Sequence, residues 1–358
     1  MISTNDPIAD LERTTGSNWS AIQSAAAAAT AKRRALIDGL TKVKLVPPDS
    51  TFVMFGSLAR SEVTAGSDLD WTLLIDGQSD TQHLRVTKAI KALVEQDNKP
   101  PGPTALFGTM AFSHELVHLI GGEADSNRNT TRRILLLLES RGMVDDDRVR
   151  DRVVRNILKR YLQEDLGYHA FHDWKRRVPR FLLNDIVRFW RTMTVDYATK
   201  RRDRDGKGWA LRNFKLRLSR KMTFTAGLAM CMSCQLCPPP SLADTKFDKP
   251  DDFYAELENY LVGFSNKPPL HVVAEFVRNF SAHTAGKKIF DAYDQFLTIL
   301  GDEAKRDRLE MLGAEDARSD PVFTDARDVG TTFQDGLTEL FFNTDTELTK
   351  ATQRYGVF

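Results

Sequence analysis

Short apolar runs alternate with amphipathic stretches over the first third of the chain. Residues 17–45 are rich in alanine and other strong helix formers, and the pattern predicts a helix that ends before the prolines of VPPDS. Two β-type runs follow, TFVMFGS at 51–57 and DLDWTLLID at 68–76. Residues 80–96 return to helical spacing, and 105–120 are predicted to contain a third strand. Strands interleaved with helices in this way predict a small α/β unit.

Beyond residue 129 the apolar positions recur at helical spacing almost to the end of the chain. The predicted fold class is therefore α+β: a small α/β domain with a mixed sheet and flanking helices, followed by a larger all-helical domain. We expect four regions: an N-terminal helical segment (1–48), the α/β domain (49–128), a helical domain with a basic stretch (129–237) and a C-terminal helical region (238–358).

Composition places the chain among ordinary globular proteins. It has 358 residues, of which 41% are hydrophobic and 28% charged, and its formal net charge is +1. No apolar run approaches the roughly 20 residues that span a bilayer, so no membrane partner is expected. The N-terminal stretch is acidic and polar, unlike a signal peptide, and three cysteines in so long a chain suit a reducing compartment. These features predict a cytoplasmic protein.

The candidate chemistry lies in the segment FGSLARSEVTAGSDLDW at 55–71. Asp68 and Asp70 are two residues apart, so on a strand both side chains leave the same face. Two carboxylates that face one way repel each other unless a cation lies between them, and Mg²⁺ (or Mn²⁺) suits such oxygen ligands. Gly56 lets the backbone approach a ligand closely, and the Ser57 hydroxyl can hold phosphate oxygens. A phosphate site beside a metal site is what nucleotidyl transfer requires.

Gly-Ser, a variable stretch and then Asp-x-Asp resembles the signature of the DNA polymerase β nucleotidyltransferase superfamily. The intervening ARSEVTAGSD, which contains Arg60 and Glu62, resembles the branch with the bacterial PII uridylyltransferases and related nucleotidyltransferases. NTTRRILLLLESRGM at 129–143 resembles the helix that follows the catalytic domain in those enzymes. The resemblance implies an NTP-dependent, pyrophosphate-releasing transferase in which Asp68 and Asp70 are catalytic metal ligands. We expect Gly56, Ser57 and Arg60 to bind the nucleotide; the alternative for Arg60 is a pair with Glu62 that holds the loop.

The superfamily usually supplies a third carboxylate from a later strand, where it binds the metal and supports the general base. The predicted strand ALFGTMAF at 105–112 contains no acid. Glu115, just after it, is the candidate for this third metal-binding and catalytic position, with Glu123 and Asp125 as fallbacks. The alternative for Glu115 is an ordinary surface carboxylate. A degenerate relative that binds nucleotide without catalysis therefore stays open.

Two other clusters of metal-ligand residue types are better explained without a metal. His114 and His118 flank Glu115, but their order is not that of a zinc-binding helix, so a structural or substrate-contact role is expected. The cysteines of CMSCQLC have a spacing that can suit zinc or an iron–sulfur cluster, yet they continue an apolar helical stretch without a nearby fourth ligand. Free cysteine commonly packs as a small buried hydrophobe, which is the role expected here.

The basic stretch from Lys175 to Lys221 contains 16 Lys and Arg residues but only 4 Asp and Glu residues. A one-sided excess of this size favours a surface that faces an anion, although a solvated helix face is the alternative. We expect Lys215, Arg217 or Lys221 to reach across a cleft towards the aspartates. They would hold either the triphosphate or the phosphates of RNA.

The leading functional hypothesis is a metal-dependent transferase that moves a nucleoside monophosphate from an NTP to a protein or RNA acceptor. The base of the NTP is left open, and no DNA partner is expected. One alternative is an oligonucleotide second-messenger synthase, whose acceptor is a second nucleotide. The other is a non-catalytic nucleotide- or RNA-binding module.

Overall fold

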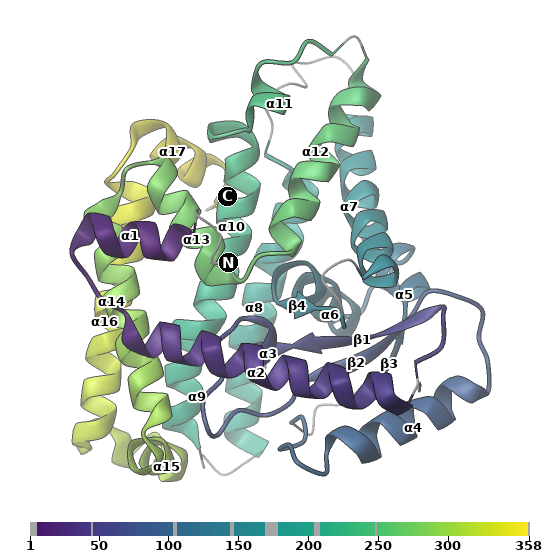
Figure 1. Ribbon diagram of the computed structural model, residues 1–358. Helices are drawn as coiled ribbons and strands as arrows, with labels where there is room; N and C mark the ends of the chain where they lie inside the picture. Colours follow the sequence, from purple (N-terminus) through teal and green to yellow (C-terminus); the bar gives the residue numbers. More distant parts are fainter. Residues whose placement is uncertain are drawn as a thin grey trace.

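The computed structural model describes residues 6–43, 46–102, 106–143, 147–168, 178–203, 208–247 and 249–356. In this part of the chain a small sheet lies beside a much larger assembly of helices (Figure 1), which confirms the predicted α+β class. None of the described helices is both long and apolar enough to cross a membrane.

Four strands form the sheet of the described residues, in the order β3-β2-β1-β4. They are β1 (Ser50–Phe55), β2 (Trp71–Ile75), β3 (Thr109–Phe112) and the two-residue β4 (Ser140–Arg141). β1 is antiparallel to β2 and β4, whereas β2 and β3 run parallel, so the sheet is mixed as predicted. The sequence pattern gives no sign of β4, because two residues are too few to show a period.

The helices are joined mostly by short connections. Those of the first part are α1 (Pro7–Thr15), α2 (Ser20–Val43), α3 (Gly56–Ala59), α4 (Gln82–Val94), α5 (Ser113–Val117) and α6 (Asn127–Leu138). Next come α7 (Arg148–Tyr168), α8 (Arg180–Asp203), α9 (Trp209–Lys215), the π-helical turn η1 (Leu216–Arg220), α10 (Lys221–Leu236), α11 (Pro240–Ala243) and α12 (Pro250–Ser265). The chain ends with α13 (Pro269–Asn279), α14 (His283–Gly301), α15 (Glu303–Met311), η2 (Asp316–Ser319), α16 (Pro321–Phe342), α17 (Thr346–Ala351) and η3 (Thr352–Gly356).

Helices cover both faces of the sheet, because successive side chains of a strand point to opposite faces. Phe52 and Met54 of β1 pack with α2 and α4, and α2 lies across the sheet in Figure 1. Val53 and Phe55 point the other way and join the core residues of α6 and α7. Every residue of β1 is buried, so this strand forms the centre of the α/β part.

Helix α2, near the start of the chain, is anchored to α14, near its end. The indole N–H of Trp19 donates a hydrogen bond to Asp291 (2.8 Å). One carboxylate oxygen of Asp294 accepts from the backbone N–H groups of Ala21 (2.9 Å) and Ile22 (3.0 Å), at the start of α2. Since α14 packs along α16, the C-terminal helices and the helix that covers the sheet form one continuous layer.

The apolar core crosses the boundaries that the sequence predicts near 48, 128 and 237. One cluster of buried residues extends from Ile8 of α1 to Ala351 of α17 and includes parts of the sheet, α6 and α14. A second, smaller cluster lies between the sheet, α2 and α4. The four regions stay a prediction about the sequence, while the packing joins them.

Candidate functional site

The turn that follows β1 requires glycine at its first position. Gly56 begins α3 with a φ of 63°, which lies in the left-handed region. A Cβ atom on Gly56 would lie 2.5 Å from Oδ2 of Asp70, so any side chain there would displace the aspartate. The next residue, Ser57, lines the same cavity as Asp70. The glycine therefore allows the Gly-Ser turn and the aspartate to lie in direct contact.

Asp68 and Asp70 lie in the extended segment just before β2, and not within the strand as predicted. The N–H of Phe55 donates to the carbonyl of Asp70 (2.9 Å), and the N–H of Leu69 donates to the carbonyl of Lys99 (2.9 Å). Leu69 is fully buried in the core between the two aspartates. Because an extended chain alternates its side chains, both carboxylates lie on the side opposite Leu69, as the spacing predicts.

One cavity joins these groups to the helical part of the chain. Its polar lining includes Lys215, Arg220 and Arg306 from the helical part and, from the two loops, Gly56, Ser57, Arg60, Glu62, Asp68 and Asp70. Arg306 of α15 lies directly over Gly66, where any Cβ atom would overlap its guanidinium group. The cavity is therefore a cleft in which the loops contribute the two aspartates and the helices contribute Lys215, Arg220 and Arg306.

Lys215 is the one residue of the three predicted basic contacts that the structure places in this cleft. Arg217 lies against Gly330 of α16. The Nζ of Lys221 donates to Gln334 of the same helix (2.7 Å). Arg217 and Lys221 therefore face α16, and the expectation that they reach towards the aspartates has to be corrected.

The π-helical turn η1 explains this division. In an α-helix, residues five positions apart point about 140° away from each other. The i→i+5 hydrogen bonds of a π-helix bring such residues to nearly the same face. Lys215 and Arg220 consequently both line the cleft. Positions 175–177 and 204–207 of the predicted basic stretch lie outside the described residues.

Three lysines from distant parts of the chain surround Asp68. The Nζ of Lys99 lies 3.3 Å from Oδ1 of Asp68. Burial lowers the pKa of Lys32 on α2 and of Lys215 on α9, and the negative charge of Asp68 partly opposes both shifts. So much positive charge around one half-exposed carboxylate favours a further anion at this end of the cleft.

Asp70 lies in a different environment. Burial raises the pKa of Asp70 to about 6; Arg220 opposes this shift, and the charges of Asp68 and Glu139 add to it. An ionised carboxylate that is buried beside other carboxylates is stabilised by any cation that binds to it. The surroundings of Asp70 therefore favour a cation at this end of the cleft.

Arg60 is buried between two carboxylates. Its Nε donates to Glu62 (2.8 Å) and its Nη1 donates to Glu139 (2.9 Å). The Tyr293 hydroxyl donates to Glu62, and the Thr223 hydroxyl donates to Glu139 (2.8 Å each). Burial would raise the pKa of Glu139, but the positive charges of Arg60 and then Arg220 hold it below its usual value. The network fastens the Gly-Ser loop to α6, α10 and α14, which favours a positioning role for Arg60 over the predicted phosphate contact.

Glu115 is not brought to the aspartates. β3 runs parallel to β2, so the residues after β3 lie at the edge of the sheet opposite Asp68 and Asp70. At that edge the Ser113 hydroxyl donates to Asp76, just past β2 (2.6 Å), and the Glu115 side chain is exposed. The expectation of Glu115 as a metal-binding and catalytic residue is therefore corrected by the direction of β3.

The fallback carboxylates do not take its place. Glu123 is exposed in a turn, and Asp125 is buried in an ion pair with Arg133 (2.8 Å). Neither lines the cleft. Glu139 comes close enough to influence Asp70, but its oxygens are held by Arg60, Arg220 and Thr223. Among the described residues no group of three His, Cys, Asp or Glu side chains could hold a metal ion.

Two carboxylates nevertheless fit a magnesium ion that is bound together with a nucleotide. Mg²⁺ is commonly held by one or two protein carboxylates, by waters and by the phosphate oxygens of the substrate. Asp68 and Asp70 supply hard oxygen donors on one side of the cleft. The donor set therefore fits Mg²⁺ (or Mn²⁺) without a third protein ligand.

The histidine and cysteine clusters lie elsewhere. His114 and His118 are exposed in and just after α5, with ring centroids 5.0 Å apart. Cys231 and Cys234 are buried in the core side of α10, and Cys237 is partly buried at its end. This packing confirms the prediction that the cysteines belong to the core.

Three of the residues that shape the cleft or its loops are not predicted from the sequence, namely Glu139, Tyr293 and Arg306. Glu139 ends the apolar run of α6, where a carboxylate among buried leucines is a signal that could have been used. Tyr293 and Arg306 follow the loop by more than 200 residues, and no pattern around them indicates the contact. Arg220 belongs to the basic stretch, but an α-helical projection does not place it with Lys215.

Residues 13–99 match the family model described as "Putative nucleotidyltransferase DUF294". No curated protein matches the chain in sequence. The matched segment begins within α1 and ends at Lys99, so it includes the Gly-Ser turn and both aspartates. It supports a relation to a nucleotidyltransferase-like family, and it does not single out the PII uridylyltransferase branch.

Proposed function

We propose that this protein is a metal-dependent nucleotidyltransferase that moves a nucleoside monophosphate from an NTP to an acceptor hydroxyl and releases pyrophosphate. The observation that carries the proposal is a single cleft that contains the Gly56–Ser57 turn, the two aspartates and Lys215. The family match over residues 13–99 supports the same kind of reaction.

The residues of the cleft divide into three roles. Ser57, Lys215 and Arg306 are placed to hold the triphosphate, because they line the cleft beside the Gly-Ser turn. Asp68 and Asp70 would hold Mg²⁺ (or Mn²⁺), which when bound neutralises the phosphates and favours departure of pyrophosphate. Arg60 lines the same cleft, and its hydrogen bonds to Glu62 and Glu139 keep the loop between these two groups in place.

Pyrophosphate release is the measurement that tests the proposal. The purified protein is incubated with each of the four NTPs and Mg²⁺ or Mn²⁺, with and without cell extract as a source of protein and RNA acceptors. We expect release with at least one NTP. Asp70→Asn should abolish it, whereas Lys221→Met, on the face of the same helical segment that contacts α16, should keep it.

Two other outcomes would replace the proposal. A small product formed from NTPs alone would identify an oligonucleotide second-messenger synthase. Nucleotide or RNA binding without pyrophosphate release under any condition would identify a binding module. Protein and RNA acceptors are separated by treating the extract with protease or with ribonuclease before the incubation.

A further inference from the structure

A second cavity opens on the other side of the aspartates. Asp68 and Asp70 also line a space of about 410 Å³ that is otherwise formed by residues of α6, α8, α9 and η1 and by Gly102, Leu106 and Phe107. This space shares Asn127, Thr192 and Asp196 with a larger cavity of about 650 Å³. The two cavities therefore adjoin and form a groove, called here the α8 groove, that leads away from the aspartates.

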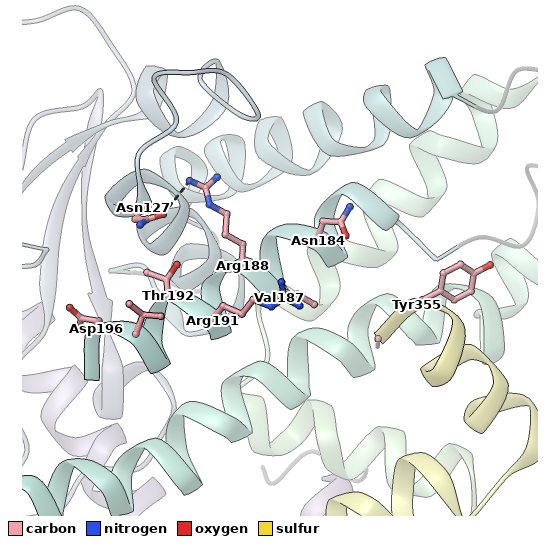
Figure 2. Close-up of a pocket in the computed structure, with 10 residues that line it drawn as sticks. Asn127, Asn184, Val187, Arg188, Arg191, Thr192, Asp196 and Tyr355 are labelled. Atoms are coloured by element: carbon pink, nitrogen blue, oxygen red, sulfur yellow. Dashed lines mark hydrogen bonds between the residues drawn. The ribbon is translucent and has the colours of Figure 1, made fainter. Parts of the chain in front are cut away.

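The α8 groove is elongated because it follows one face of a long helix. Its lining residues on α8 run from Asn184 to Asp196 at spacings of three and four positions. Twelve positions of an α-helix extend about 18 Å. Figure 2 shows Arg188 reaching from α8 towards Asn127 of α6, and Tyr355 of the C-terminal turn η3 at the far end. A ligand that fills the groove is therefore a chain of several units and not a single small molecule.

Arginine dominates the charge of the groove. Arg128, Arg212 and Arg220 lie near the aspartates, and Arg188 and Arg191 lie further along α8. Among the described residues that line the groove, Asp196 is the only acidic one besides Asp68 and Asp70. Arg188 and Arg220 are partly neutralised by Asp125 and Glu139.

Arg128 and Arg191 are exposed, and neither makes an ion pair within the part of the chain that the structure describes. They are therefore available for an anion. A positive groove of this length suits a polyanion, since every unit of such a chain brings a charge that an arginine can meet.

The remaining polar and aromatic groups suit nucleotides better than a peptide. Asn127 and Asn184 offer amide groups that both donate and accept hydrogen bonds, as base edges require. Phe107 at the near end and Tyr355 at the far end offer half-buried rings, and proteins that hold single strands stack bases on such rings. The α8 groove therefore combines positive charge with accessible aromatic rings, the two features by which proteins hold single-stranded nucleic acid.

We infer that the α8 groove binds the 3′-terminal stretch of a single-stranded polynucleotide, whose terminal hydroxyl is the acceptor. The inference rests on the proposed function. The hydroxyl oxygen of the terminal sugar attacks the α-phosphorus of the NTP, and a new P–O bond forms. The bond from the α-phosphorus to the bridging oxygen breaks, pyrophosphate leaves with the electron pair, and the hydroxyl proton passes to solvent. The strand lengthens by one nucleotide in each cycle.

Binding and extension are tested separately. Fluorescently labelled oligonucleotides, one RNA and one DNA of the same sequence, are titrated with the full-length protein without NTP. Arg128→Gln/Arg191→Gln should raise the Kd about tenfold and lower the slope of log Kd against log salt by about 1.4, the value for two single-strand phosphate contacts. Arg34→Gln/Lys91→Gln is the matched control, because it removes two exposed charges from α2 and α4 beyond the opposite face of the sheet.

The same oligonucleotides are then incubated with NTP and metal, and their lengths are read on a denaturing gel. Strands with a free 3′ hydroxyl should lengthen, and strands that end in a 3′ phosphate should not. Extension of RNA alone means that the site reads the 2′ hydroxyl, whereas equal extension of both strands means that it does not. Either result supports the inference.

The inference is overturned if the wild type does not bind the oligonucleotides, or if the groove variant and the control bind them equally well. It is also overturned if the strands bind but are not extended while labelled NTP modifies a protein in cell extract. In that case the proposed function stands with a protein acceptor. If no acceptor yields pyrophosphate with any NTP, the proposed function itself has failed.

Discussion

Asp68 and Asp70 differ in their surroundings, and the difference predicts opposite effects on stability. The raised pKa of Asp70, about 6 instead of 3.8, means that its ionised form destabilises the metal-free fold above pH 6, and that this cost is absent below 3.8. Asp70→Asn should therefore abolish transfer yet raise the free energy of unfolding at pH 7, by at most about 3 kcal/mol. Urea unfolding without metal and pyrophosphate release measure the two effects.

Asp68→Asn is the matched control. It should abolish transfer as well, but it leaves Lys32, Lys99 and Lys215 without their common carboxylate. Its free energy of unfolding should therefore stay the same or fall. A variant of Asp68 that is stabilised, or a variant of Asp70 that is destabilised, would contradict the different environments described for the two residues.

We expect replacement of Arg60 to affect the stability of the fold more than the binding of substrate. Arg60→Met leaves two buried carboxylates without their shared counter-charge and should lower the free energy of unfolding by about 3–5 kcal/mol. Adding Glu62→Gln removes one of these charges and should restore part of the loss. Chemical unfolding of the single and double variants checks this. If the double variant is less stable than Arg60→Met, the network does not work as described.

For individual residues, the sequence predicts correctly those parts of the cleft whose residues are close together along the chain. Gly56, Ser57, Asp68 and Asp70 form a local signature, and the structure places them in one cleft. Glu115, just after the third predicted strand, is expected to supply the third carboxylate. Because β3 runs parallel to β2, however, Glu115 lies at the edge of the sheet opposite Asp68 and Asp70. Glu62 is close to Arg60 in the sequence, but no local pattern specifies Glu139 as the second partner of Arg60 or Tyr293 as the partner of Glu62, because both lie far along the chain.

The π-helical turn between α9 and α10 makes a specific prediction for two partly buried lysines. Lys215→Met should lower kcat/KM for the NTP by at least about tenfold, because it removes a charge from the cleft. Lys221→Met should leave kcat/KM unchanged, because Lys221 contacts α16. Steady-state kinetics of both variants decide the point, and equal losses would mean that the turn does not separate the two faces.

Lys221 also predicts a dependence of stability on pH. Burial lowers its pKa from 10.5 to about 8, so the unfolded chain binds more protons than the folded one between these values. The free energy of unfolding should rise with pH over this window through Lys221, and should not change through it below 8. Lys221→Met removes this rise, so the difference between variant and wild type should shrink towards high pH. Urea unfolding at several pH values between about 7 and 10 measures it.

Most helices and strands were predictable because they contain enough residues for the period of their apolar positions to be recognised. α2, α4 and the first two strands lie where the pattern places them. The π-helical turn was not predictable, because the spacing of its basic residues in the sequence is equally compatible with a regular α-helix. The packing of α10 against α8 and α13, and of α9 and η1 against α16, fixes the rotation that sends Lys215 and Arg220 to the cleft.

At the scale of the whole molecule the packing predicts one cooperative unit. A fragment that contains residues 49–128 alone lacks β4 and also lacks Glu139 and Tyr293, the distant partners of Arg60 and Glu62. We expect it to remain unfolded by circular dichroism and proton NMR, whereas the full chain should melt in a single transition. A fragment with dispersed amide resonances would show instead that the predicted boundaries mark an independent domain.

The predicted division into four regions rests on changes in composition and on proline- and glycine-rich stretches. These local signals cannot reveal contacts between the two ends of the chain. The hydrogen bonds from Trp19 to Asp291 and from α2 to Asp294 are examples, since nothing near Trp19 distinguishes it from any other aromatic residue. The α+β class was predictable, because it depends only on the kinds of elements and their order.

The hydrogen bond between Glu62 and Tyr293 also determines how late in protein synthesis the site can be completed. The two residues are 231 positions apart, so at 5–20 residues per second a ribosome needs roughly 10–50 s to make the second after the first. During that interval the nascent chain carries the Gly-Ser turn and both aspartates, but neither Tyr293 nor Arg306. A chain released before Tyr293 is made therefore lacks part of the cleft, and we expect it to show none of the proposed nucleotidyl transfer.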